Sequence, residues 1–263
     1  MATLVSFHAH PDDEAIATGG TLAKAAAAGH RVVLVSATRG EHGEFADDVL
    51  DPGEALWQRR VQELEDAAKI LGVDRVAFLG YTDSGMMGTP ENDVSGSFWR
   101  ADVEEAARKL AAILTEERAD VLTCYDHHGN YGHPDHIQVH RVGVRAGELA
   151  GTAKVYEATV DRDHIIELMT RAKEMGVPDV PDVEGVDETM GMPGDAITTR
   201  VDVRAYLDLK RKAMAAHASQ ISETSFFLSM PPEAFELTWG TEWFILRGAP
   251  PGTREDDLFA GLP

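Results

Sequence analysis

Short apolar runs alternate with longer amphipathic segments along the first 160 residues of the chain. Residues 31–36 carry the densest run, Val-Val-Leu-Val, and such β-branched residues are typical of a strand buried in a parallel sheet. Residues 54–71 have apolar side chains at helical spacing and end at Gly72. Further strands are expected at 4–7, 76–79, 121–124 and 154–158, and further helices at 15–28, 100–117 and 135–149. This order predicts an α/β fold with a Rossmann-like, mostly parallel sheet flanked by helices.

The pattern changes after residue 160. Residues 163–175 and 203–218 have helical spacing, and residues 243–246 resemble a strand. Residues 176–196 are rich in Gly, Pro and Asp, which is typical of a long loop. We therefore expect a Rossmann-like core over residues 1–160 and a smaller C-terminal lobe over 161–263 that completes the same domain. The final dozen residues are expected to form a loose tail.

The amino-acid composition indicates which kinds of binding partner and which cellular location to expect. The apolar share of 43% suits a soluble protein with a sizeable core. With 24 basic and 45 acidic residues the net charge is −21, which repels phosphate backbones and anionic membranes, so neither nucleic acid nor a membrane is expected as a partner. A single cysteine, Cys124, and a start without a basic segment predict a cytoplasmic protein. The sequence leaves open whether copies of the chain form a homo-oligomer.

Polar residues gather where the predicted parallel strands end. They fall in three segments, residues 8–14, 81–85 and 126–136. Five of the eleven histidines lie between residues 127 and 140. Because ligands of open parallel sheets bind at the carboxyl ends of the strands, a functional site is expected at this edge.

The tripeptide His-Pro-Asp occurs twice in these segments, in His10-Pro-Asp-Asp13 and in His133-Pro-Asp-His136. Each proline disfavours helix through the preceding histidine, so the first and fourth residues of the turn can converge on one point. Two such turns can supply a His₂Asp set with an open fourth position, which is the arrangement of catalytic zinc. The same set suits Fe²⁺, and spacing alone does not exclude His133 as a further ligand.

A purely structural interpretation of these residues also exists. Asp12 and Asp13 can cap the helix that follows, and His136 and His140 can form a solvated helix face. Three adjacent carboxylates at 12–14 would repel one another without a cation, however. Because both turns also fall at strand ends, the pair of motifs favours a metal site.

At this point the chain resembles a known family. Residues 9–14, Ala-His-Pro-Asp-Asp-Glu, and 131–136, Tyr-Gly-His-Pro-Asp-His, are similar to the PIG-L/LmbE-like zinc-dependent N-acetylglucosaminyl deacetylases. The similarity covers at least residues 3–150, so residues 1–160 are expected to be the catalytic core. Residues 216–220, Ala-His-Ala-Ser-Gln, resemble the mycothiol branch of the family, which holds the N-acetylglucosaminyl-inositol deacetylase and the mycothiol S-conjugate amidase.

The resemblance implies a role for each residue of the first motif. His10 and Asp13, together with His136, would bind zinc, and Asp12 would be the general base. The chemistry suits an amide, whose carbonyl is a poor electrophile. A metal polarises that carbonyl and lowers the pKa of its water towards about 7. A carboxylate beside the metal then accepts the proton.

The resemblance also implies roles for the second motif. His133, as an imidazolium, would stabilise the oxyanion and protonate the leaving amine instead of binding the metal. Asp135 would tune His133 by its charge and hydrogen bonding. Tyr131 would help to polarise the carbonyl.

Five residues are candidates for contact with the sugar. Arg60 and Asp83 match positions that resemble substrate contacts in the family, and Glu44 is a third candidate. The alternative explanation for these three residues is that they form surface ion pairs without contacting a substrate. His217 and Gln220 can reach the site from the C-terminal lobe, and their alternative is to cap or pack their own helix.

We expect a metal-dependent hydrolase that deacylates an N-acyl amino sugar resembling N-acetylglucosaminyl-inositol. The alternative is a mycothiol S-conjugate amidase, which residues 225–228 and 239–242 resemble more closely. A non-catalytic sugar- or nucleotide-binding module is a third interpretation. Asp12 and His133 argue against it, because a binder needs neither a base nor an oxyanion donor. The loop 176–196 is expected to close over the sugar.

Overall fold

A single mixed sheet forms the centre of the protein. The computed structural model describes residues 1–46, 49–174 and 182–262, and over these residues the sheet has seven strands in the order β3-β2-β1-β4-β5-β7-β6. The strands are β1 (Thr3–His8), β2 (Arg31–Ser36), β3 (Arg75–Phe78), β4 (Val121–Tyr125), β5 (Lys154–Thr159), β6 (Thr199–Asp202) and β7 (Thr241–Leu246). Strands β1 to β5 run parallel, and β7 pairs antiparallel with both β5 and β6. The predicted α/β class with a mostly parallel sheet is confirmed.

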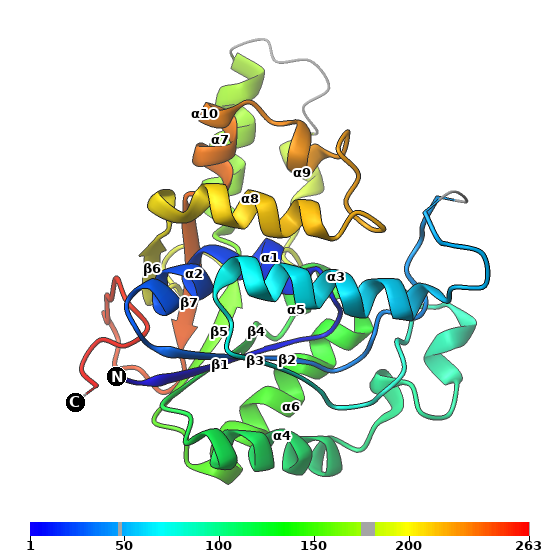
Figure 1. Ribbon diagram of the computed structural model, residues 1–263. Helices are drawn as coiled ribbons and strands as arrows, with labels where there is room; N and C mark the ends of the chain where they lie inside the picture. The colour runs from blue at the N-terminus through cyan, green and yellow to red at the C-terminus, as the bar shows by residue number, and fades with distance from the viewer. Residues whose placement is uncertain (47–48, 175–181, 263) are drawn as a thin grey trace.

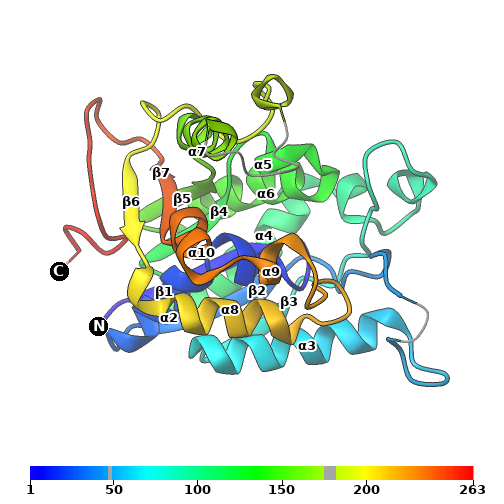
Figure 2. The ribbon, with the colours of Figure 1, turned by 90° about the horizontal axis from the view of Figure 1, so that it is seen from above.

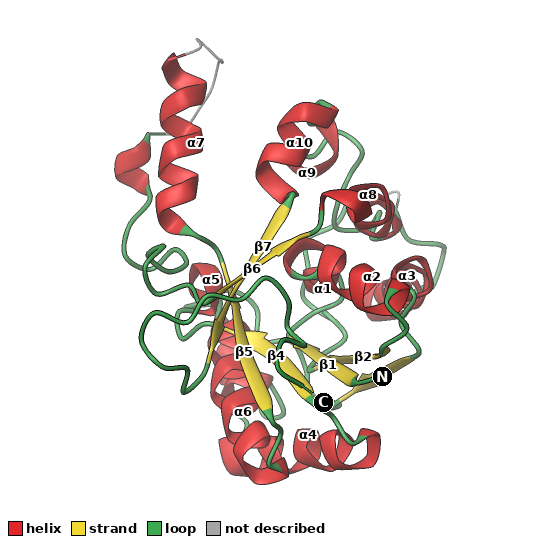
Figure 3. Ribbon diagram, turned by 90° about the vertical axis from the view of Figure 1, so that its left-hand side faces the viewer, coloured by secondary structure: helices red, strands yellow, loops and turns green. Residues whose placement is uncertain are grey.

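Helices cover both faces of the sheet (Figure 1). One face carries α1 (Asp13–Ala17), α2 (Gly19–Ala27) and α3 (Leu56–Leu71), with α8 (Leu207–Ala216) packed outside them (Figure 2). The opposite face carries α4 (Val103–Glu117) and α6 (Pro134–Ala150), as the side view in Figure 3 shows. The remaining helices are α5 (Gly129–Gly132), α7 (Arg162–Glu174), α9 (Phe226–Ser229) and α10 (Pro232–Trp239), with short 3₁₀ turns at Pro90–Asp93, Phe98–Arg100, Val183–Gly185 and Arg204–Tyr206.

This layering explains the continuous apolar runs of the strands. Strands β1, β2 and β4 are buried along nearly their whole length because helices lie on both sides. Helix α3 ends at Gly72, whose φ of 77° is a left-handed cap that glycine adopts without strain. The single helix expected at 15–28 is divided at Thr18, where φ of −135° interrupts the helical backbone.

The C-terminal segment is more ordered than its sequence suggested. Strand β6 and helices α9 and α10 were not anticipated. The expectation of a loose tail is wrong, because Glu255 accepts hydrogen bonds from Lys154 Nζ at 2.9 Å and Tyr156 Oη at 2.6 Å. Leu258 is buried, and the Phe259 ring stacks on His30 at 3.8 Å. The tail therefore packs against β5 and against His30, which precedes β2.

The loop expected to act as a lid is described only in part. Its residues 176–181 lie outside the described residues, as does residue 175 of the helix expected before it. Further along, the Gly191 amide donates to the Asn130 carbonyl at 2.9 Å, and Arg162 donates to the carbonyls of Glu188, Met190 and Gly191. The described part of the loop therefore contacts the segment between β4 and α6. Among the described helices, none is long and apolar enough to cross a membrane.

Candidate metal centre and active site

The three polar segments meet at the carboxyl edge of the sheet, as expected. Residues 8–14 leave β1, and residues 126–136 leave its neighbour β4. Strand β3 lies two places from β1, so the loop after it must cross over to reach the same point. It does so at Ser84, whose amide donates to Asp135 Oδ2 at 2.9 Å.

The residues expected to bind zinc converge. Asp13 Oδ2 lies 3.5 Å from His10 Nδ1, and Asp13 Oδ1 lies 3.3 Å from His136 Nε2. His10 is 7% exposed and His136 is 2% exposed, so both are shielded from water. His10 also forms one potential metal-binding group with His133 and His136, and a second with Asp83 and Asp135. The described residues can therefore hold a metal ion.

The charge balance of the site favours a cation. Burial lowers the pKa of His10, but the charges of Asp83, Asp13 and Asp135 outweigh it and raise that pKa well above its usual range. Burial likewise opposes ionisation of Asp13, but His136 and His10 hold its pKa well below its usual range. Ionised carboxylates buried this closely are costly without a compensating charge. A mixed set of imidazole and carboxylate ligands fits zinc or Fe²⁺.

Asp12 occupies an unusual backbone conformation. Its φ of 113° and ψ of −32° are sparsely populated for a residue with a side chain. Asp12 stands at the N-cap of α1, yet its carboxylate makes no capping hydrogen bond, so the helix-cap interpretation does not apply to it. Instead Oδ2 lies 3.2 Å from Arg60 Nη2. Burial raises the pKa of Asp12 to about 6, against the opposing charge of Arg60, which leaves it largely ionised at neutral pH.

The second motif forms the start of α6. His133 is the N-cap, and its Nδ1 accepts a hydrogen bond from the Asp135 amide at 3.1 Å. This nitrogen therefore carries no proton, and burial together with the charges of His10 and His136 lowers the pKa of His133 to about 4. This pKa favours the neutral ring over the imidazolium that the resemblance implies, and the hydrogen bond at Nδ1 leaves Nε2 as the nitrogen that can donate.

The Asp135 carboxylate contacts His10 and not the His133 ring. Its Oδ2 lies 3.1 Å from His10 Nε2, and the Ser84 hydroxyl donates to its Oδ1. The Ser84 amide adds the hydrogen bond to Oδ2. Asp135 thus orients a proposed metal ligand, and Ser84 fixes Asp135.

Tyr131 lies at the open side of the cluster. Its hydroxyl is 3.4 Å from His136 Nε2, and the residue is 51% exposed, so it can meet an incoming ligand. The loop that carries it approaches α6 closely at Gly129, where φ is 65°. A Cβ built at Gly129 would lie 2.6 Å from the Cβ of His136, so only glycine fits.

Arg60 and Asp83 are buried at this site, which removes the surface ion pair as their explanation. Arg60 donates to the carbonyls of Pro11 at 2.6 Å and Gly40 at 3.0 Å, in addition to its contact with Asp12. Asp83 Oδ1 lies 3.5 Å from His10 Nε2 and also accepts the Gly85 amide at 2.8 Å. Both side chains border the cluster.

The other sugar-contact candidates are placed differently. Glu44 is exposed, and its carbonyl accepts a hydrogen bond from Gln220 Nε2 at 3.3 Å. Gly43, next to it, lies against both Gln220 and Arg60, so this loop reaches the side of the cluster. His217 has no exposed surface, and its Nε2 lies 2.6 Å from Glu14 Oε1. For His217 the structure favours the packing alternative over contact with a sugar.

A buried polar network below the cluster was missed in the sequence. His8 Nδ1 lies 2.7 Å from the Tyr125 hydroxyl, and its Nε2 lies 2.8 Å from Ser6 Oγ. Thr123 Oγ1 is 2.7 Å from the same Ser6 hydroxyl. The sequence does contain a signal for this network. Ser6 and His8 are polar residues two positions apart in an otherwise apolar strand, so their side chains lie on the same face of the sheet. Ser84 likewise belongs to a motif in which only Asp83 was singled out.

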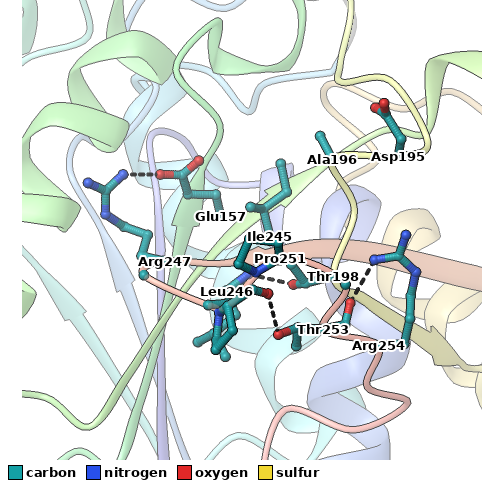
Figure 4. Close-up of a pocket in the computed structure, with 14 residues that line it drawn as sticks. Glu157, Asp195, Ala196, Thr198, Ile245, Leu246, Arg247, Pro251, Thr253 and Arg254 are labelled. Carbon is teal, nitrogen blue, oxygen red and sulfur yellow. Dashed lines mark hydrogen bonds and ion pairs between the residues drawn. The ribbon is translucent and has the colours of Figure 1, made fainter.

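A separate pocket lies away from these residues (Figure 4). It has a volume of about 380 Å³, and its lining includes Arg247, which donates to Glu157 at 2.5 Å. None of the residues that line it belongs to the metal-binding groups. This pocket is therefore distinct from the histidine and carboxylate cluster.

A cluster of histidine and aspartate side chains with a further carboxylate beside it, at the carboxyl edge of a Rossmann-like sheet, fits the site of a metal-dependent hydrolase. Residues 5–147, more than half of the chain, match the family model described as GlcNAc-PI de-N-acetylase, PIG-L. The chain belongs to this family. It is accordingly an enzyme that hydrolyses amide bonds, and the family resemblance inferred from the two motifs is confirmed.

Relatives cover nearly the whole chain. It is 43% identical to the 1D-myo-inositol 2-acetamido-2-deoxy-alpha-D-glucopyranoside deacetylase of Thermomonospora curvata, over 97% of this chain and 95% of that protein. The protein of the same name from Acidothermus cellulolyticus is 42% identical, over 100% of this chain and 96% of its own length. The crystal structure of the conserved protein TT1542 from Thermus thermophilus matches with a TM-score of 0.60 and 23% identity, over 97% of this chain and 100% of that chain, and supports the fold alone.

Proposed function

We propose that this enzyme is a zinc-dependent deacetylase whose substrate is N-acetylglucosaminyl-inositol. The observation that carries the proposal is the convergence of His10, Asp13 and His136 beside the half-buried Asp12 carboxylate. The substrate follows from the names of the relatives, which are more than 40% identical over nearly the full chain. The proposed partner is therefore a small N-acylated amino sugar.

His10, Asp13 and His136 would hold the zinc ion. When bound, zinc would supply Lewis-acid activation of both the amide carbonyl and the attacking water. The same ligands suit Fe²⁺. Comparing turnover of the zinc-loaded and the iron-loaded protein shows which metal supports the reaction. Asp135 supports this assignment, because its contact with His10 Nε2 leaves Nδ1 free to face the ion.

Asp12 would accept the proton of the attacking water. Its pKa of about 6 lies close enough to neutrality for the same carboxyl to return that proton to the leaving nitrogen as the C–N bond breaks. The products are acetate and the free amine. Arg60 donates a hydrogen bond to the Asp12 carboxylate at 3.2 Å and would help to hold it in place.

His133 would stabilise the oxyanion. A neutral ring can donate a hydrogen bond from Nε2 but cannot release that proton at neutral pH, so we assign the leaving-group proton to Asp12 and not to His133. Removing one oxyanion donor costs about 3–4 kcal/mol of transition-state stabilisation in comparable enzymes. The exposed Tyr131 hydroxyl is a second donor for the same oxygen.

Arg60, Asp83, Glu44 and Gln220 are the proposed sugar contacts. Asp83 is the strongest of them, because its carboxylate borders His10 and can accept hydrogen bonds from a hydroxyl of the sugar. Glu44 and Gln220 come from opposite ends of the chain and meet beside Arg60.

A second candidate function is hydrolysis of mycothiol S-conjugates. The observation in its favour is Phe226, which is 67% exposed within the segment that resembles the amidase. The experiment that decides is amine release by the zinc-loaded protein from N-acetylglucosaminyl-inositol and from an S-conjugate of mycothiol. We expect a higher kcat/KM for the first. Preference for the conjugate would make the protein an amidase, and release from neither, with zinc bound, would overturn both assignments.

A further inference from the structure

Glu14 is the last acidic residue of the first motif, and neither the proposed metal set nor the proposed base uses it. It has no exposed surface. Both of its carboxylate oxygens have partners: Oε2 accepts the Asp12 amide at 3.0 Å, and Oε1 lies 2.6 Å from His217 Nε2. Glu14 therefore joins the backbone of the proposed base to a residue far along the chain.

His217 stands at the end of α8, in the C-terminal lobe. It too has no exposed surface. Burial lowers its pKa, but the charge and hydrogen bond of Glu14 outweigh this and raise the pKa of His217 above its usual value. Helix α8 packs against α1, α2 and α3 (Figure 2), and His217 at its C-terminal end contacts Glu14 in the first turn of α1.

The peptide unit between Pro11 and Asp12 is held from two directions. The Pro11 carbonyl accepts Arg60 Nη2, and the Asp12 amide donates to Glu14. The Asp12 carbonyl accepts the amides of Ala15 and Ile16. A residue at φ of 113° persists only where its surroundings determine its conformation. Glu14 supplies the contact on the amide side.

We propose that the buried Glu14–His217 pair is a positioning device for Asp12, through which the C-terminal lobe fixes the direction of the base. This inference rests on the proposed function, because it gives Asp12 the role of base. His217 acts through Glu14, which is its hydrogen-bond partner. It is needed because a buried carboxylate with only one amide partner would be left uncompensated.

The variants Glu14→Ala, His217→Ala and His217→Gln test the proposal. Glu14→Ala and His217→Ala are expected to lower kcat by about 10- to 100-fold, since a small displacement of a catalytic group has an effect of this size. KM and zinc affinity, measured by chelator competition, are expected to stay within about twofold. His217→Gln keeps an N–H donor for Glu14 and is expected to recover most of the rate.

Arg211→Ala is the matched control. Arg211 also lies on α8, but it donates to the carbonyls of Leu228 and Met230 and makes no contact with the turn. It is expected to lower thermal stability without lowering kcat. A loss of kcat in Arg211→Ala equal to that in His217→Ala would show that any loosening of α8 lowers the rate, and would overturn the proposal.

A double-mutant cycle separates this inference from the proposed function. In an Asp12→Ala background, Glu14→Ala is expected to lower the residual rate by less than about twofold, because the group that it positions is gone. The same loss in both backgrounds would overturn the positioning role. If Asp12→Ala alone kept the normal rate, the proposed base would be wrong, independently of Glu14.

Discussion

At the residue scale, Asp12 combines features that rarely occur together in one side chain. Its backbone is in a sparsely populated conformation, its carboxylate is half-buried, and its charged partner is Arg60. Strain of this kind is retained where it serves a function. Because the ion-pair partner of the Asp12 carboxylate is Arg60 and not one of the proposed ligands His10 and His136, we expect metal binding and turnover to be separable.

Asp12→Ala tests this separation. We expect it to keep one zinc ion per chain and to lose about 10²- to 10⁴-fold in kcat, the usual effect of removing a general base. Zinc content by elemental analysis and amine release by a fluorescent amine assay provide the two readouts. Loss of the metal together with the rate would make Asp12 a ligand instead.

Ser84→Ala tests whether the hydrogen bond from Ser84 to Asp135 helps to orient the proposed metal ligand His10. Without the Ser84 hydroxyl, Asp135 keeps only the amide of residue 84 and is less able to orient His10. We expect zinc affinity to fall by about 10- to 100-fold, as for other outer-shell partners of metal-binding histidines. If zinc affinity in chelator competition is unchanged, Ser84 stabilises only the loop after β3 and does not affect the metal site.

Sequence reasoning reached some of these residues and not others for a physical reason. Each His-Pro-Asp motif spans only four consecutive residues, so it can be recognised in the sequence. His10, Asp13 and His136 could therefore be predicted from spacing and resemblance. The contacts of Ser84 with Asp135 and of His217 with Glu14 join residues that are distant along the chain. Only the crossing of the loop after β3 and the packing of α8 bring these partners together.

At the scale of elements, the start of α6 shows how closely the site is built into the fold. The His133 side chain caps the helix, and His136 follows within its first turn. Gly129 allows the preceding loop to touch this turn. The strands and helices of the core were predictable because each is long and periodic, whereas β6, α9 and α10 are short and depend on tertiary contacts.

Gly129→Ala is expected to lower both stability and zinc affinity, because its Cβ would push against His136. Gly151→Ala is the matched control: φ is 67° there, close to the 65° of Gly129, and a Cβ at residue 151 meets nothing within 4 Å. Both variants carry the left-handed penalty of about 1–2 kcal/mol. Chemical denaturation with and without zinc should show the additional loss for Gly129→Ala alone, and equal behaviour of the two would refute the clash.

At the scale of the whole molecule, the C-terminal segment returns to the beginning of the chain. Helix α8 lies on α1 to α3, strand β7 pairs with β5, and the tail packs on β5 and His30. The composition of the tail gave no sign of this, because Glu255 looks like an ordinary surface carboxylate until its partners are known. The segment after residue 160 therefore supports the site as well as closing the sheet.

Glu255→Gln tests the anchoring of the tail. Despite partial burial, hydrogen bonds from Tyr156 and Lys154 lower the pKa of Glu255, so its stabilising effect is present above its unfolded pKa of about 4.3 and is lost as the pH falls through the lower folded value. We expect the variant to be less stable by about 1 kcal/mol at pH 7 and the difference to shrink below about pH 4. Urea unfolding at both pH values measures it, with the exposed neighbour in Asp256→Asn as control. A difference independent of pH would contradict the account.

The central claim is that a metal ion held by His10, Asp13 and His136 works with Asp12 to hydrolyse an N-acetyl amino sugar. The most direct measurement is a titration of the metal-free protein with zinc, following amine release from N-acetylglucosaminyl-inositol and zinc bound per chain in the same samples. The account predicts that activity rises in proportion to zinc up to one ion per chain, and that Asp12→Ala binds the same ion without comparable release. Full activity in the metal-free protein, or one bound zinc ion without any release, would contradict it.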